Sequence, residues 1–205
     1  EGKNLALVSD AGLPAISDPG ADLVQLALEQ GISVIPVPGA NAALSSLIVS
    51  GLPTERFTFI GFLPRERKEI QAVLEPLQAA SGTLLFYESP HRVMKTLKAI
   101  LEILGNRRIV LARELTKRYE EFVRGTIEEC LEYLEEHAPI GEYCLVLEGA
   151  DPKEEQKKRD AWWQELTVEE HVQHYEGEGL PRKDAMKKAA ADRGVSKRDV
   201  YNALL

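Results

Sequence analysis

Short apolar runs alternate with segments of helical periodicity along most of this chain. Apolar runs that end at glycine, proline or a charged residue predict strands, and apolar residues spaced three and four positions apart predict helices. The predicted strands cover 5–8, 32–37, 57–62, 83–88, 108–112, 121–124 and 143–147. The predicted helices cover 19–30, 41–50, 65–80 with an interruption at Pro76, 89–104 and 127–137. This alternation predicts an α/β fold whose second sheet is mixed.

The last quarter of the chain follows a different pattern. Charged residues and glutamine fill 151–159 without apolar periodicity, which predicts a linker or an exposed helical spacer. Three short helices are expected after it, the last two of which resemble a helix-turn-helix that serves either for packing or for contact with RNA. Their start and stop signals are a capping box at Thr167 and Glu170, a helix over 181–192, a stop at Gly194, and a cap at Ser196 that begins a helix over 197–204. The expected domains are therefore 1–54, 55–150 and 160–205, with Trp162 and Trp163 as packing anchors of the last.

Two loops that follow predicted strands carry the candidate chemistry of the first domain. Ser9–Gly20, with the sequence SDAGLPAISDPG, contains two glycines, two prolines and two aspartates. Its Ser17-Asp18-Pro19 segment is expected to cap the next helix. Pro38–Asn41 forms a second tight loop before a helix of small residues. Such corners present backbone donors at the carboxyl edge of a sheet, where open α/β folds bind ligands, so we expect a ligand site here.

Composition and charge limit the possible partners. The chain has 205 residues, 44% hydrophobic and 28% charged, which is typical of one or two globular domains. No run approaches the roughly 18 apolar residues of a membrane span and no leader opens the chain, so we expect a cytoplasmic protein without a membrane partner. The formal net charge is −8, but residues 56–118 carry twelve basic and six acidic residues, and residues 179–205 carry seven and three. These two basic zones suit either a polyanionic partner or ordinary solvated helix faces.

Several familiar chemistries have no support in the sequence. Phosphate-binding and dinucleotide-binding glycine motifs are absent, as is a hydrolase elbow. Cys130 and Cys144 lack the spacing of a zinc site or a disulfide framework and are expected to be buried thiols. His91 follows a helix start, where such a residue is more often a donor than a catalyst. Glu88 ends an apolar strand, and it either contacts a ligand or forms a buried pair with Arg92 or Arg113.

Four segments taken together resemble one family. They are SDAGLPAISDPG at 9–20, PGANAALSSLIVSGLPTERFTFIGFLPR at 38–65, LLFYESPHR at 84–92 and LARELTKRYEEFVRGT at 111–126. The chain resembles the bacterial 16S rRNA cytidine 2'-O-ribose methyltransferases of the tetrapyrrole methylase superfamily. It departs from the family pattern at Leu13, where threonine is usual, and at Ala40-Asn41, where proline and serine are usual.

The resemblance implies a two-lobed tetrapyrrole-methylase-like fold with a small C-terminal helical element, commonly as a homodimer. It implies S-adenosyl-L-methionine as cofactor, and methyl transfer to a cytidine ribose in small-subunit ribosomal RNA. No metal is implied. Glu88 and Asp10 are the candidate catalytic bases near the cleft, with Glu114 also eligible. The cofactor contacts carried over by motif are Ser9, Asp10, Ala11, Gly12, Pro14, Asn41, Ala42, Tyr87 and Ala112. The candidate RNA phosphate contacts, from the basic middle segment, are Arg92, Arg113, Lys117 and Arg118.

Family members also have a strand, a glycine-containing loop and an acidic segment before the point where this chain starts. The first lobe is therefore expected to be incomplete, and the chain weak or inactive as an enzyme unless another segment completes that lobe. Two other functions stay open from the sequence. One is the same fold methylating a small tetrapyrrole, for which the basic tail would be unnecessary. The other is a non-catalytic RNA-binding module, in which the two loops are only turns.

Overall fold

The computed structural model describes residues 2–153 and 162–204, which form two compact units, 1–150 and 151–205. The first unit is centred on a mixed five-stranded sheet in the order β1-β2-β5-β3-β4. Only β1 and β2 are parallel, and β5 runs antiparallel between β2 and β3. These strands match the five predicted between 57 and 147. Their bounds are β1 Phe57–Phe62, β2 Thr83–Glu88, β3 Arg108–Arg113, β4 Glu121–Thr126 and β5 Tyr143–Leu147.

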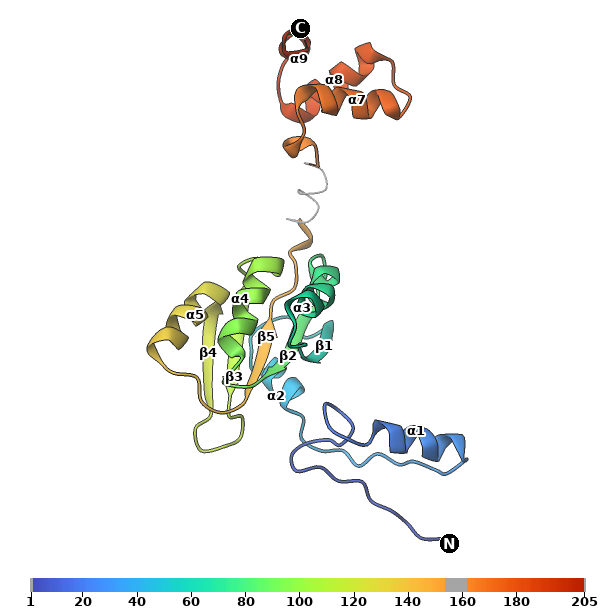
Figure 1. The fold of residues 1–205 in the computed structure, drawn as a ribbon, viewed down its shortest axis with the longest axis vertical. Coiled ribbons are helices and arrows are strands. Elements are labelled where there is room, and N and C mark those ends of the chain that lie inside the picture. The colour runs from blue at the N-terminus through green and yellow to red at the C-terminus, as the bar shows by residue number, and fades with distance from the viewer. Residues whose placement is uncertain (1, 154–161, 205) are drawn as a thin grey trace. The chain divides into compact units, whose positions relative to one another are not determined.

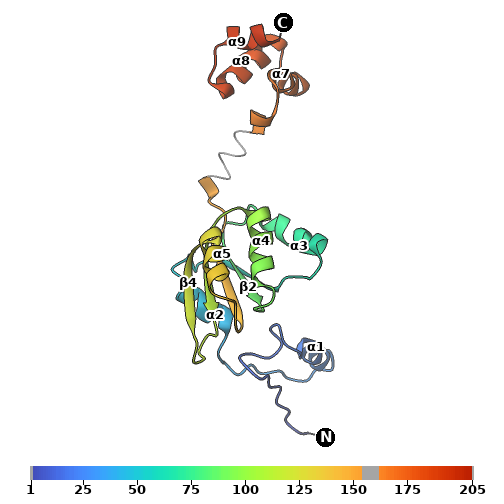
Figure 2. The same cartoon turned by 60° about the vertical axis from the view of Figure 1, so that its left-hand side comes forward.

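Helices cover both faces of this sheet. α3 (Arg67–Leu74), α4 (Val93–Leu104) and α5 (Ile127–Glu136) lie on one face, and α2 (Ala42–Ile48) lies on the other (Figures 1 and 2). Side chains alternate between the two faces, because successive residues of a strand point in opposite directions. Leu84 and Phe86 therefore join the core beneath α3–α5, whereas Leu85 joins the smaller core beneath α2.

Local signals explain where several helices begin and end. The predicted interruption at Pro76 is confirmed, since α3 ends at Leu74 and a 3-10 turn, η1, follows at Glu75–Leu77. α5 begins at a capping box in which Thr126 and Glu129 satisfy each other's backbone N–H groups. α4 begins at Val93, after Ser89 and Pro90 have made a non-helical turn, so the expected start at these two residues is wrong by one turn.

The βαβ unit predicted at the start of the chain is wrong. Only its helix forms, as α1 (Ala21–Glu29), and none of the described residues 2–20 or 30–41 is in a strand. The apolar side chains of the two expected strands are exposed, with Leu5 at 92% and Val37 at 81%. A strand exists only through hydrogen bonds to a neighbour, and no described strand lies beside these segments. The expected cap at Ser17 is also wrong: α1 follows Gly20, without a side-chain cap.

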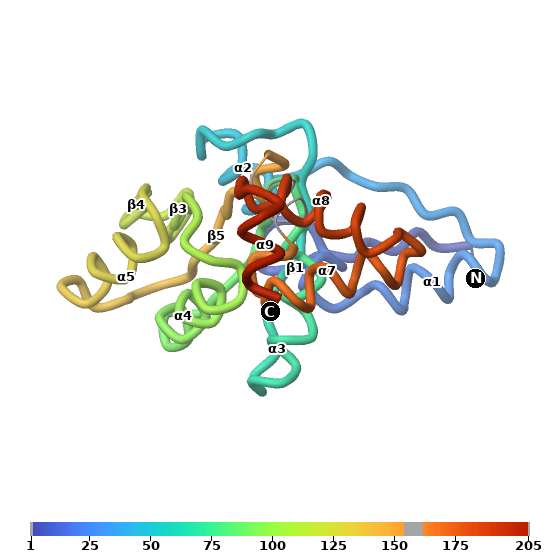
Figure 3. The backbone as a smooth tube through the Cα atoms, turned by 90° about the horizontal axis from the view of Figure 1, so that it is seen from above, coloured from blue at the N-terminus to red at the C-terminus, as the bar shows by residue number. Residues whose placement is uncertain are grey.

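The second unit has a small core of its own. It contains η2 (Trp162–Glu165), α7 (Val168–Gly177), α8 (Arg182–Arg193) and α9 (Lys197–Ala203), which are traced from orange to red in Figure 3. The Thr167 capping box, the Gly194 stop with φ of 64°, and the Ser196 cap are all confirmed. Its core consists of Val172, Tyr175, Ala185, Met186, Ala189, Ala190 and Val200. The predicted linker lies mostly at 154–161, outside the described residues.

Trp162 and Trp163 pack as predicted, against His171 on α7, with ring centroids 5.1 and 5.5 Å from it. Cys130 and Cys144 are free and buried, and desolvation raises the pKa of each thiol to about 11. Within the described ranges, no helix is long and apolar enough to cross a membrane. Those ranges also place no group of three His, Cys, Asp or Glu side chains suited to a metal ion.

Candidate cofactor site

The first loop, Ser9–Gly20, has an irregular and locally strained backbone. The Ser9 hydroxyl donates to the carbonyl oxygen of Ala11 at 3.2 Å, closing a short turn. Gly12 has φ of 74°, while Ala15 and Ser17 adopt φ of 65° and 58° without being glycine. Non-glycine residues in this region are uncommon and concentrate at functional sites. The loop therefore holds backbone conformations of the kind that often occur at functional sites.

The structure brings the first loop against the second, Pro38–Asn41. A Cβ at Gly12 would lie 3.1 Å from the carbonyl oxygen of Ala40, and one at Gly39 would lie 3.3 Å from Cδ2 of Leu13. A side chain at Gly12 would press on the backbone of the second loop, whereas one at Gly39 would meet the end of the Leu13 side chain. The predicted cofactor residues of the two loops, Ser9 to Pro14 and Asn41 with Ala42, thus belong to adjacent stretches of backbone.

The second loop leads directly into α2, whose first turn is tied to the sheet. The Asn41 side chain accepts a hydrogen bond from the Leu44 N–H at 2.9 Å, which makes Asn41 the N-cap. The Ala43 N–H, which has no partner within the helix, donates to the hydroxyl oxygen of Tyr87 on β2 at 3.1 Å. Burial raises the pKa of Tyr87, so its hydroxyl stays protonated at neutral pH. Tyr87 therefore fixes the second loop onto the end of β2.

The two predicted contacts from the second lobe share one face of the sheet. Tyr87 and Ala112 both pair in register with Cys144 of β5, and all three point toward α2. The Tyr87 ring also meets Phe59 and Phe62 edge-on, at 5.0 and 5.7 Å between centroids. Ala112 itself is 1% exposed, which places it within the core under α2. This arrangement gives an apolar floor with a half-buried aromatic ring beside two glycine-containing loops.

Gly61 is a further residue of this region that the sequence analysis did not single out. It has φ of 75° at a register shift in β1, and a Cβ there would lie 3.3 Å from the Ser17 hydroxyl oxygen. A glycine inside a predicted strand is the signal that could have revealed it, because such a residue often marks a bulge or a close backbone approach.

The candidate base Glu88 is 2% exposed and fully engaged within the protein. One carboxylate oxygen accepts the Ser89 N–H at 2.8 Å, and the other accepts the Thr96 hydroxyl at 2.7 Å. Arg92 lies 3.5 Å away and also donates to the carbonyl oxygens of Leu63 and Pro64, both at 2.7 Å. Of the two sequence alternatives, the buried pair with Arg92 is the one the structure forms. These contacts of Glu88 and Arg92 join the end of β2 to the residues that follow β1.

The other candidate carboxylates differ in their surroundings. Asp10 lies exposed in the first loop. Glu114 accepts the Glu142 N–H at 2.9 Å and pairs with Lys117 at 3.0 Å, and these contacts lower its pKa. A carboxylate held in its ionised form by such donors is a weaker proton acceptor.

Most of the candidate RNA-contacting cations have partners within the protein. Arg113 pairs with Glu121 at 3.0 Å, and Lys117 contacts Glu142 at 2.9 Å in addition to Glu114. These contacts raise the pKa of Lys117. Arg118 is exposed, with its guanidinium 5.5 Å from the centre of the Tyr119 ring. Of the four predicted phosphate contacts, Arg118 is the one whose charge meets no carboxylate among the described residues.

The sheet, its covering helices and the paired loops define a methylase-type α/β lobe. The family described as Tetrapyrrole (Corrin/Porphyrin) Methylases matches residues 1–131. Among solved structures, the methyltransferase CobJ superposes with a TM-score of 0.51 at 19% identity, covering 68% of this chain and 62% of that one, a likeness of fold alone.

Sequence relatives are much closer. The ribosomal RNA small subunit methyltransferase I of Halalkalibacterium halodurans is 54% identical over 98% of this chain and 69% of its own length. The protein of the same name from Synechocystis is 40% identical over 100% of this chain and 72% of its own length. The chain belongs to the tetrapyrrole methylase family, and within it to the group of these methyltransferases. It is a methyltransferase whose cofactor is S-adenosylmethionine.

Proposed function

We propose that this protein methylates the 2'-hydroxyl of a cytidine ribose in 16S ribosomal RNA. The observation that carries the proposal is the 54% identity, over nearly the whole chain, to a protein named for methylation of small-subunit ribosomal RNA. The choice of cytidine and of the ribose oxygen rests on the motifs at 9–20, 38–65, 84–92 and 111–126. The pairing of the two loops supports the same conclusion, because it assembles the motifs that the sequence separates.

The residues present fit the cofactor. S-adenosylmethionine supplies an electrophilic methyl group when it is bound. The two close-packed loops, with Ser9, Gly12 and Asn41, would surround its polar parts with backbone groups, and Tyr87 with Phe59 would provide apolar surface for its adenosine. Alignment of the ribose hydroxyl with the methyl group and exclusion of water then account for most of the rate enhancement expected of such an enzyme.

Asp10 is the better candidate for accepting the ribose proton. A general base needs a carboxylate oxygen that can reach the hydroxyl, and Asp10 is exposed in the cofactor loop. Both oxygens of Glu88 are already hydrogen-bonded, so Glu88 would act by holding the ends of β1 and β2 in place. Asp10→Asn should lower the methylation rate, measured at saturating cofactor, by roughly 10²-fold or more. A rate within two-fold of wild type would remove Asp10 from this role.

Arg118 is the proposed phosphate contact from the second lobe. Its loop is held by the contacts of Lys117 with Glu114 and Glu142, which leave Arg118 and Tyr119 pointing to solvent. Arg92 and Arg113 are proposed to support this surface from within. We further infer that the protein works in the cytoplasm as a homodimer on the small ribosomal subunit, which light scattering of the protein and co-sedimentation with subunits would test.

The central experiment is nucleoside mass spectrometry. Small subunits reconstituted with unmodified transcribed RNA are incubated with the protein and S-adenosylmethionine, and the RNA is then digested to nucleosides. The expected product is 2'-O-methylcytidine, in one copy per subunit. A base-methylated nucleoside, or methylation of an added tetrapyrrole precursor without methylation of RNA, would overturn the proposal. Calorimetric titration of the cofactor accompanies the assay and shows that the site is competent.

A further inference from the structure

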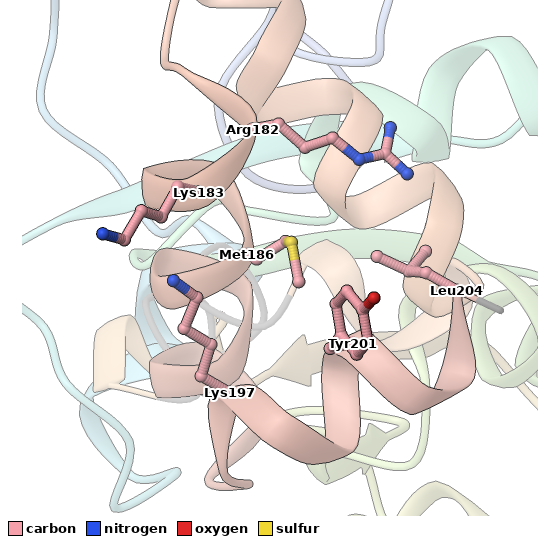
Figure 4. A pocket seen from close by; sticks show the side chains of 6 residues that line it. All are labelled: Arg182, Lys183, Met186, Lys197, Tyr201 and Leu204. Atoms are coloured by element: carbon pink, nitrogen blue, oxygen red, sulfur yellow. The ribbon is translucent and has the colours of Figure 1, made fainter.

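The second unit contains a hollow of about 450 Å³ between α8 and α9. Its walls come from the first half of α8, from α9 and from Leu204 just after it, and the Met186 side chain lies in the middle of the group (Figure 4). The lining residues are Arg182, Lys183, Met186, Lys197, Tyr201 and Leu204. This volume is within the range of small-ligand pockets and is large enough for one nucleotide.

Three of the six lining side chains are cations, and their charge is poorly balanced. Arg182 lies 3.6 Å from Glu176, whereas Lys183 and Lys197 have no carboxylate within ion-pair distance among the residues the structure describes. Residues 179–205 as a whole carry seven basic and three acidic residues. Like charges gathered at one hollow raise the local positive potential, which favours an anionic ligand.

The floor of the hollow is apolar and includes an aromatic ring. Tyr201 is 54% exposed, and Met186 and Leu204 lie beside it. Both helices are fixed from below, since Ala185, Ala189 and Val200 are buried in the core of the unit and a capping box at Ser196 begins α9. A ring held on a rigid helix with one side open is suited to stacking against a nucleic-acid base.

We propose that this hollow binds an unpaired nucleotide of RNA. The base stacks on Tyr201 over the side chains of Met186 and Leu204, while Lys183 and Lys197 contact the flanking phosphates. A hollow that combines an exposed aromatic ring and apolar side chains with cations matches a nucleotide better than an acidic peptide, which offers charge without a planar base. This inference rests on the proposed function for its ligand, and it assigns the second unit a role in holding single-stranded RNA.

Fluorescence anisotropy with the complete chain tests the stacking contact. The probe is a labelled ten-nucleotide single-stranded RNA of mixed sequence. Tyr201→Ala should weaken binding at least five-fold, because loss of one stacked base costs about that much or more. Tyr201→Phe keeps the ring and should bind within two-fold of wild type. Equal binding by wild type and Tyr201→Ala would overturn the inference, as would equal affinity for the single strand and for duplex RNA or polyglutamate.

The lysines are tested by salt dependence. Lys183→Gln combined with Lys197→Gln should reduce the magnitude of the slope of log affinity against log salt by about 1.4. Each phosphate contact with a single strand contributes about 0.7 to that slope, and the double variant loses two. The matched control is Lys187→Gln with Arg198→Gln, which removes the same charge from exposed positions outside the lining set. An identical change in slope for both pairs would reduce the site to a general charge effect and overturn the inference. Circular dichroism of each variant confirms that its helices are intact.

The methylation assay separates this inference from the proposed function. If wild type makes 2'-O-methylcytidine but Tyr201→Ala binds RNA as wild type does, the inference alone is wrong. If Tyr201→Ala loses RNA binding and wild type makes no methylated nucleoside while binding its cofactor, the proposed function alone is wrong.

Discussion

Tyr87 shows how one side chain joins two parts of the candidate site. Its ring packs against Phe59 and Phe62 on the sheet, while its hydroxyl accepts the Ala43 N–H at the start of α2. The sequence places Tyr87 in a motif but says nothing about this partner, which is 44 positions away. The role of the hydroxyl is therefore a property of the folded chain.

Tyr87→Phe should weaken cofactor binding several-fold, with a loss of about 1 kcal/mol in stability. The reason is that the Ala43 N–H loses its acceptor and the second loop is no longer held to β2. Calorimetric titration with S-adenosylmethionine measures the affinity. Tyr133→Phe is the control, because it removes a hydroxyl bonded to Glu121 at 2.7 Å, away from the two loops. Similar affinities in both variants would contradict the expectation.

Glu88→Gln should destabilise the first unit by about 2 kcal/mol. The variant keeps the shape of the side chain but loses the charge that accepts from Ser89 and Thr96 and faces Arg92. Thermal unfolding followed by circular dichroism measures the change. Glu102→Gln is the control, because Glu102 pairs with Arg67 at 2.6 Å on the exposed surface and should contribute less than about 0.5 kcal/mol. A melting profile equal to that of wild type would contradict this structural role for Glu88.

At the scale of elements, four of the five strands from 57 to 147 were predictable because each is a short, largely apolar run between clear turn signals, whereas β4 is mostly polar and only partly buried. Their order was not, since β5 lies between β2 and β3 and only pairing decides that. The predicted strands at 5–8 and 32–37 show the converse. Their apolar residues would be buried if a neighbouring strand paired with them. No strand lies beside them among the described residues, and these side chains are exposed.

The two loops make a sharper test of the site than either does alone. Gly12→Ala adds a Cβ 3.1 Å from the Ala40 carbonyl oxygen at a positive φ. It should weaken cofactor binding several-fold, because the Ala40 backbone must shift by a few tenths of an ångström to accept the new methyl group. Gly31→Ala is a matched control, with φ of 68° and no atom within 4 Å of the added Cβ. Each carries a similar backbone cost of about 1 kcal/mol, so a difference in affinity isolates the contact between the loops.

At the scale of the whole molecule, the chain is two units with separate cores. In the second unit, the His171 side chain is buried between the Trp163 ring and the side chains of Arg193 and Asp192. Arg193 donates to Nδ1 of His171 at 3.1 Å, so that nitrogen must be unprotonated. Both tryptophans of the chain are at 162 and 163, and tryptophan fluorescence therefore reports on this unit alone.

The second unit should lose stability as the pH falls below about 6.5. Burial first, and then Arg193, lowers the pKa of His171 in the folded unit, although Asp192 opposes the shift. The unfolded chain therefore binds the proton more readily, so stability is complete above the ordinary pKa and declines during acidification toward the folded pKa. Urea unfolding followed by tryptophan fluorescence measures this trend. It should flatten in His171→Gln and persist in His174→Gln; a trend that survives in His171→Gln would assign it to another group.

The sequence by itself determined the family, the cofactor, the mixed α/β class and the capped helices of the second unit, because motifs, periodicity and caps are local. Tertiary structure decided which candidate residues are free to act. It paired Glu88 with Arg92, joined Lys117 to two carboxylates, set Gly12 against Ala40 and placed cations of α8 and α9 in one hollow with Tyr201. Each of these depends on contacts between positions distant along the chain or on the local direction of a side chain, and only folding fixes them.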